Sequence, residues 1–252
     1  MQNPLQPHPT LISPTTYTQH RTPTTTLTAG RSHKPFTFDT HKLMACSPYW
    51  RNLLTETPEP TAEQTTFEDL DESAVGLFAG YLQHGRSLQR MKGPSDFHSC
   101  GHWIGLYVVA LRWGVGGLDD EVMDHIRAYY ASADMSASPY RLEYIYAYTS
   151  QPNLMRTFLV ETAAWRVLNE GSSTTPSGAT GELGERGGVS PALFEVLEKG
   201  GRELREDFVR ALVKFGRDEG QEAEDPRRGL RRDWHVGVER GDEGEMLEPW
   251  EK

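Results

Sequence analysis

The stretch that says most about the fold is residues 36–54, which read FTFDTHKLMACSPYWRNLL. Phe36 and Phe38 alternate with polar residues, and this period of two predicts a half-buried strand. Ser47-Pro48 then marks the start of a helix, because a serine oxygen caps free backbone N–H groups and proline suits the first helical position. The sequence therefore predicts a short strand that leads directly into helices.

The neighbouring segments extend this pattern in both directions. Thr24–Ala29, followed by Gly30, predicts a strand that forms a hairpin with the first one. Glu63–Leu70 is a third strand candidate, and Asp71 is placed to cap the next helix, which ends at His84-Gly85. After a polar loop at residues 86–100, apolar residues recur every three or four positions in helices that begin near Trp103, Leu118, Pro139, Leu154, Pro191 and Leu204. Strands followed by helices favour an α+β fold over a doubly wound parallel sheet.

Composition divides the chain into a domain with flanking segments. The predicted parts are a disordered Thr/Pro-rich tail (1–23), a folded domain (24–131), a C-terminal helical extension (132–169), a Gly/Ser/Thr-rich linker (170–190), a helical segment (191–216) and a disordered charged tail (217–252). A group of arginines at 227–232 has acidic neighbours on both sides, which favours a solvated tail segment over a nucleic-acid-binding or nuclear import signal.

Charge and cysteine content narrow the function classes. The 252 residues carry a formal net charge of −10, which gives no electrostatic reason to bind nucleic acid or an anionic membrane. The two cysteines form no disulfide framework, so a reducing compartment is expected. The first residues do not resemble a secretory signal, and the longest apolar run, Trp103–Leu111, is too short to span a bilayer. We expect a cytoplasmic or nuclear location.

One segment resembles a known family signature. Phe38-x-x-His41-Lys42-x-Met44-Ala45-x-Ser47-x-Tyr49-Trp50 is similar to the signature of BTB/POZ domains, in which an aromatic strand residue precedes His-Lys, a Leu-Ala pair and Ser-x-Tyr-Phe. Met44 and Trp50 stand where Leu and Phe are usual, and both replacements keep an apolar core residue. The residues that match this scaffold motif are Phe38, His41, Lys42, Met44, Ala45, Ser47, Tyr49 and Trp50.

Residues 70–85, 104–118 and 144–160 resemble later parts of the same family, the last of them the extra helices of many fungal members. The resemblance implies that residues 24–131 form a short sheet flanked by a cluster of helices, with additional C-terminal helices. It also implies a non-enzymatic protein-interaction module that forms a homodimer and recruits a protein partner. Many family members bridge a cullin-based ubiquitin ligase to its substrate, so a cullin adaptor is the alternative function.

A second alternative comes from a different class of function. His98-x-Cys100-x-His102 offers zinc ligands, and a small metal-binding protein or hydrolase would use these three residues. A structural zinc site needs four ligands, and only the distant Cys46, His41 or His84 would complete it. The sequence therefore favours a loop with two exposed histidines and a half-buried thiol.

The remaining reactive side chains are expected to be structural. A free cysteine such as Cys46 is commonly a small buried hydrophobe. His41 is expected to be a hydrogen-bonded scaffold residue near the strand end. No catalytic, cofactor-binding or metal-binding residue is predicted.

Overall fold

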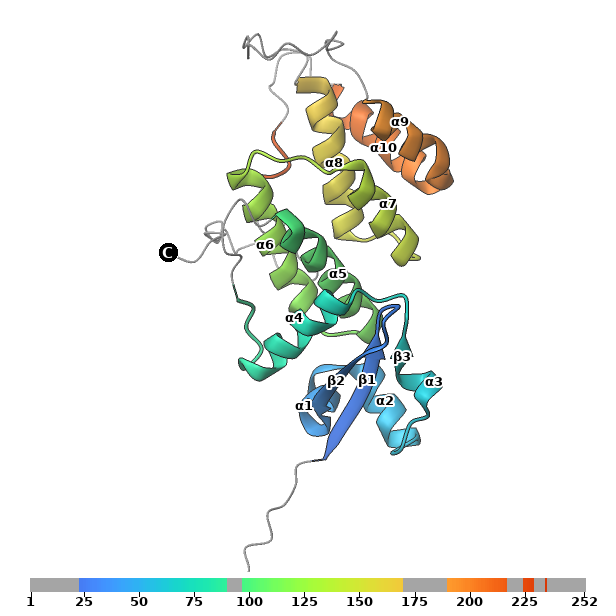
Figure 1. Cartoon of the computed structure of the whole chain (residues 1–252). Coiled ribbons are helices and arrows are strands. Elements are labelled where there is room, and N and C mark those ends of the chain that lie inside the picture. The colour runs from blue at the N-terminus through green and yellow to red at the C-terminus, as the bar shows by residue number, and fades with distance from the viewer. Residues whose placement is uncertain (1–22, 90–96, 170–189, 217–223, 229–233, 235–252) are drawn as a thin grey trace, which may run out of the picture.

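The computed structural model describes residues 23–89, 97–169, 190–216, 224–228 and 234 (Figure 1). Across these residues the chain forms ten helices and one three-stranded sheet, so the predicted α+β class is confirmed. The sheet lies at one end of the molecule, and the helices extend away from it (Figure 1). Within the described ranges, no helix has the length and apolar character that crossing a membrane requires. The predicted tail at 1–23 and linker at 170–190 lie outside these ranges, apart from their last residue.

The predicted hairpin is confirmed. β1 (Thr24–Ala29) and β2 (Lys34–Asp39) pair antiparallel, with Leu27 opposite Phe36. Gly30 takes a φ of 72° at the turn, a left-handed conformation that glycine adopts without steric cost. Successive side chains of a strand point to opposite faces, so every second residue of β1 faces the core. This is the arrangement that the alternation of apolar and polar residues predicts.

The strand predicted at Glu63–Leu70 is largely wrong. The chain instead forms a helical turn, α3 (Ala62–Thr65), followed by the two-residue strand β3 (Thr66–Phe67). The Gln64 side chain accepts a hydrogen bond from the Thr61 backbone N–H at 2.9 Å, half of a capping box that stabilises a helix start. β3 then pairs parallel to β1, which gives the strand order β2-β1-β3.

Ser47 separates two short helices and joins them to the core. α1 (Thr40–Cys46) ends at Ser47, and α2 (Pro48–Glu56) begins after it. The Ser47 hydroxyl accepts a hydrogen bond from the Trp50 N–H at 3.2 Å and donates one to the Trp113 carbonyl at 2.5 Å. The serine is fully buried, so one side chain both caps α2 and fastens it to a helix 66 residues away in the chain.

Five longer helices form the body of the protein. They are α4 (Glu72–Gln83), α5 (Phe97–Trp113), α6 (Leu118–Ser132), α7 (Pro139–Tyr148) and α8 (Leu154–Asn169). α5 lies at the centre of the molecule (Figure 1), and all residues from 103 to 110 are buried. Because α5 begins at Phe97, the predicted loop at 86–100 is shorter than expected.

Four aromatic rings fill the space between the sheet and α5. The Trp113 ring lies 5.4 Å from Trp50, 5.5 Å from Phe67 and 5.1 Å from Phe78, measured between centroids, in edge-on geometry. Such pairs add about 0.5–1.5 kcal/mol each beyond the burial of apolar area. The cluster therefore joins α2, β3 and α4 to α5.

Two further helices pack on α7 and α8. α9 (Pro191–Lys199) and α10 (Gly201–Gly216) follow the segment at 170–189. The buried Arg156 of α8 forms an ion pair with Glu203 of α10 at 2.8 Å. The buried residues of α10 are Leu204, Phe208 and Ala211. Apolar packing and a buried cation together hold this helical segment on the body.

The prediction of a solvated tail is wrong at two positions of the C-terminal segment. Arg227 and Trp234 are both buried. The Arg227 guanidinium lies 2.7 Å from Asp225 and 2.8 Å from Asp134, and this pairing offsets the cost of burying its charge. The rest of the predicted tail, apart from 224–228, lies outside the described residues.

Replacing Ser47 tests the role of its hydroxyl. Ser47→Ala leaves a buried carbonyl and a helix N–H without partners, so we expect unfolding to become easier by about 2–3 kcal/mol. Ser190 provides a matched control, because it precedes a proline and caps α9 in the same way but is exposed. Ser190→Ala should cost about 1 kcal/mol. Urea denaturation of both variants measures the difference, and equal losses would contradict the role of the Trp113 contact.

Candidate functional site

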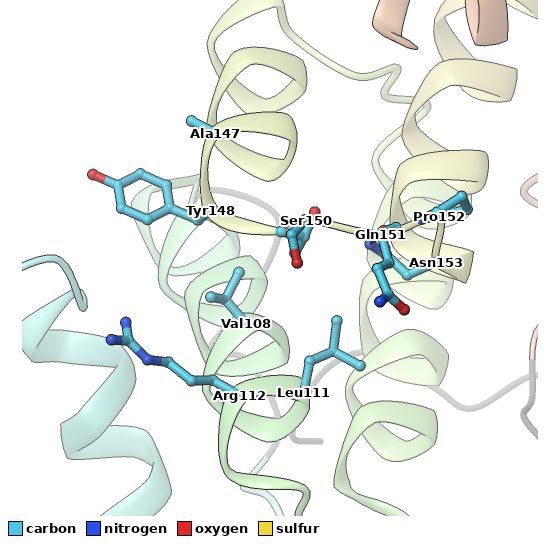
Figure 2. A pocket seen from close by; sticks show the side chains of 10 residues that line it. Val108, Leu111, Arg112, Ala147, Tyr148, Ser150, Gln151, Pro152 and Asn153 are labelled. Carbon is cyan, nitrogen blue, oxygen red and sulfur yellow. Dashed lines mark hydrogen bonds between the residues drawn. The ribbon is translucent and has the colours of Figure 1, made fainter.

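Two pockets lie along α5, each with its other wall formed by α7 or the connection that follows it, and the two pockets together are called the groove. Its first part is a pocket of about 640 Å³. Figure 2 shows Val108 and Leu111 of α5 facing the connection between α7 and α8. The lining residues are Val108, Leu111, Arg112, Ala147, Tyr148, Thr149, Ser150, Gln151, Pro152 and Asn153.

The second part of the groove is a pocket of about 610 Å³ nearer the start of α5. It is lined by Asp71, Gly101, His102, Ile104, Ser138, Tyr140, Arg141 and Tyr144. Both pockets therefore take one wall from α5 and one from α7. Along each of these two helices, the residues that line one pocket begin about one turn after the last of those that line the other.

A ladder of three tyrosines connects the two pockets. Tyr140, Tyr144 and Tyr148 are spaced by four residues, so they lie on one face of α7. Their neighbouring ring centroids are 6.4 and 4.6 Å apart. Tyr140 is 69% exposed and Tyr148 is 42% exposed, which leaves large aromatic surface open to a ligand.

Two aspartates that precede α4 bind to α5, and one of them, Asp71, lines the second pocket. Arg112 forms an ion pair with Asp69. The His102 Nδ1 lies 2.5 Å from one oxygen of Asp71, while the other Asp71 oxygen accepts a hydrogen bond from the Ser73 N–H and caps α4. Both carboxylates are therefore held in place by side chains of α5.

The Tyr144 hydroxyl is buried and has no hydrogen-bond partner among the described residues. Burial raises the pKa of Tyr144, and the negative charge of Asp71 raises it further, so the phenol stays neutral. A buried hydroxyl without a partner costs about 1–3 kcal/mol. A bound group that exchanges a hydrogen bond with Tyr144 would recover this energy.

Gly105 lets the walls of the groove approach α5. A Cβ at this position would lie 2.9 Å from the Ala74 Cβ, 3.3 Å from the Tyr144 hydroxyl and 3.4 Å from the Asp71 Cβ. The first distance is shorter than any normal carbon–carbon contact. A glycine is thus required where α4, α5 and α7 meet.

The motif residues of the sequence analysis lie elsewhere, in β2, α1 and α2. Phe38, Ser47 and Trp50 are core residues, and Met44 is partly buried. The remaining four, His41, Lys42, Ala45 and Tyr49, are exposed. The prediction that His41 is a hydrogen-bonded scaffold residue is wrong, because its side chain points to solvent in the first turn of α1 and has no hydrogen-bond partner in the described part of the chain.

Cys100 and His102, two of the three possible zinc ligands, are not brought together. The predicted loop is part of α5, where residues two positions apart point to different sides. Cys100 is fully buried, which raises the pKa of its thiol to about 11, whereas His102 is partly exposed in the groove. The His98 side chain lies outside the described part of the chain, and the described residues contain no group of three or more possible metal ligands.

The other cysteine behaves as predicted. Cys46 is buried, and its thiol donates a hydrogen bond to the Leu43 carbonyl at 3.3 Å. Burial raises the pKa of Cys46, which lowers the fraction of reactive thiolate.

The His102–Asp71 pair is the arrangement in the groove that comes nearest to acid–base chemistry. A carboxylate that accepts a hydrogen bond from a histidine fixes the ring orientation, as in many active sites. Activation of a nucleophile also requires a hydroxyl or thiol bonded to the other ring nitrogen. No such group bonds to His102 within the described residues, and the pair instead joins the start of α4 to α5.

Comparison with protein-family models, with curated proteins and with solved structures found no match to this chain.

Two glycines of α5 provide a test of the groove geometry. Gly105→Ala forces a contact with Ala74, so we expect a loss of about 1–3 kcal/mol in the free energy of unfolding. A Cβ at Gly101 meets no atom within 4 Å, so Gly101→Ala should stabilise the same helix by up to about 1 kcal/mol. Thermal and urea unfolding measure both changes. Effects of the same sign would show that Gly105 is not in close contact.

Proposed function

We propose that this chain is a non-enzymatic protein-interaction module of the BTB/POZ type, which recruits a protein partner through the groove between α5 and α7. The observation that carries the proposal is the half-exposed tyrosine ladder that spans two adjoining pockets. Tyrosine contributes a large rigid ring together with a polar hydroxyl, and for this reason it is enriched where proteins bind one another.

The size of the groove fits a short peptide segment. Eight residues separate Tyr140 from Tyr148, which corresponds to about 12 Å along the helix axis. An extended chain covers that distance with about four residues. The polar groups at the two ends, which include His102 and Asn153, would exchange hydrogen bonds with the backbone of such a segment, and Tyr144 would gain the partner that it lacks.

The sequence resemblance supports the same class of function. The motif from Phe38 to Trp50 builds the unit of β2, α1 and α2, and Ser47 joins this unit to α5. In this proposal the motif supplies the scaffold, and the helices after it supply the binding surface.

Replacing one tyrosine tests the groove. We would select peptides that bind the full chain from a random display library and measure their affinity by calorimetry. Tyr148→Ala should weaken the selected peptides at least tenfold, because an interface aromatic of this kind contributes about 2 kcal/mol or more. Phe194→Ala is the matched control, since Phe194 is an aromatic residue on α9 with 62% exposure. Peptides affected equally by both variants, or by neither, would contradict the groove as the binding site.

The resemblance also implies a homodimer. We expect size-exclusion chromatography with light scattering to give twice the chain mass at about 100 µM, well above the dissociation constant of a stable dimer. A monomeric mass at this concentration would contradict dimerisation and leave the peptide measurement unaffected. The cullin adaptor is the alternative role, and titration with the N-terminal domain of a cullin tests it.

A further inference from the structure

The described part of the C-terminal segment is seated on a surface formed by α6 and α8, away from the tyrosine groove. The Arg227 guanidinium lies 2.8 Å from Asp134 and donates a hydrogen bond to the Met135 carbonyl at 3.1 Å. It also lies 4.9 Å from the centroid of the Trp165 ring. The body of the protein thus offers a carboxylate, a carbonyl and an aromatic face to a single arginine, and Asp225 of the segment itself completes the pairing.

The second contact is made by Trp234. Its ring meets the Phe158 ring edge-on at 5.3 Å between centroids. The Arg127 guanidinium lies 5.7 Å from the centre of the same ring, a cation–π contact. The tryptophan is 6% exposed, so almost its whole surface is covered.

The two subsites have matching spacings. On α8, Phe158 and Trp165 are seven residues apart, which places them on one face at a separation of about 10 Å. Arg127 on α6 and Asp134 in the turn after it are also seven residues apart. Arg227 and Trp234, which occupy the two subsites, are also seven residues apart, and their order along the chain is opposite to that of the subsites along both helices.

We propose that this surface is a second peptide-binding site, specific for a partner segment that carries an arginine and, seven residues later, a tryptophan, and that Arg227 and Trp234 of the chain itself occupy the site in cis. Recognition rests on the Asp134 carboxylate and the Trp165 face for the arginine, and on Phe158 and Arg127 for the tryptophan. This site is independent of the proposed function at the groove between α5 and α7.

Because the occupant belongs to the same chain, a free partner peptide must compete with it for the site. A segment joined to the body by a short connection acts at an effective concentration in the millimolar range. Asp134 is 86% exposed, so one half of the arginine contact is open to water and exchange with a competing arginine is sterically accessible. A free partner peptide therefore binds well only when the resident segment is weakened or displaced.

The test uses the full chain. A fluorescent peptide of residues 224–236 is titrated by anisotropy into the wild-type chain and into the double variant Arg227→Ala, Trp234→Ala. We expect at least tenfold tighter binding to the double variant, because its own segment no longer competes. Arg228→Ala is the matched control, since Arg228 lies in the same segment but is 72% exposed, and it should behave as the wild type.

A peptide that itself carries both alanines should not bind any of the chains. The proposal is overturned if the double variant remains folded by circular dichroism and does not bind the wild-type peptide. It is also overturned if light scattering shows a wild-type dimer that the double substitution dissolves, because the occupant would then be a second copy of the chain.

Should the double variant fail to fold, a nicked chain keeps the proposal testable. A protease site placed at residues 217–223 of the full chain allows the C-terminal piece to be cut after folding. Exchange of that piece for excess labelled peptide on size-exclusion chromatography is the expected result. A piece that stays bound and never exchanges would show that the segment is a permanent part of the core.

Discussion

The hydrogen bond from the Ser47 hydroxyl to the Trp113 carbonyl is the contact on which the arrangement of the other elements depends. It joins the junction of α1 and α2 to the end of α5, and it lies beside the aromatic cluster that includes Trp50 and Trp113. The contact sets the position of α5 relative to the sheet. α5 in turn places Gly105 and His102, and these two residues determine how closely α4 and α7 approach the groove.

Buried arginines have a comparable role at the other end of the molecule. Arg156 is held by Glu203, and Arg227 is held by Asp134 and Asp225. A buried guanidinium adds little net stability, but its loss of hydration is compensated only in one geometry. The later segments of the chain are thus positioned by specific charge pairs as well as by apolar burial.

Much of the architecture was predictable from local signals. The hairpin follows from alternation around Gly30, and the starts of several helices follow from caps such as Asp71 and Ser190. The strand expected at Glu63–Leu70 failed because the capping interaction of Gln64 outweighed the strand propensity of the threonines. Sequence patterns indicate capping and strand propensity one at a time, whereas the fold depends on which of the two is the stronger at each position.

The candidate sites were harder to predict. The spacing of Tyr140, Tyr144 and Tyr148 is visible in the sequence, yet the pattern alone does not show which tyrosines remain exposed. Arg227 belongs to a group of arginines whose acidic neighbours in the sequence favour a solvated tail segment, because its partner Asp134 is 93 residues away in the chain. Exposure and long-range pairing are properties of the assembled structure.

The complete burial of α5 from residue 103 to 110 has a consequence for how the protein can be divided. α5 is covered on one side by elements before residue 131 and on the other by α7, so it presents no polar face to water. A fragment that ended at residue 131 would expose this helix and tend to self-associate. The same reasoning applies to α8, which α10 covers, so the smallest practical unit for expression extends through α10.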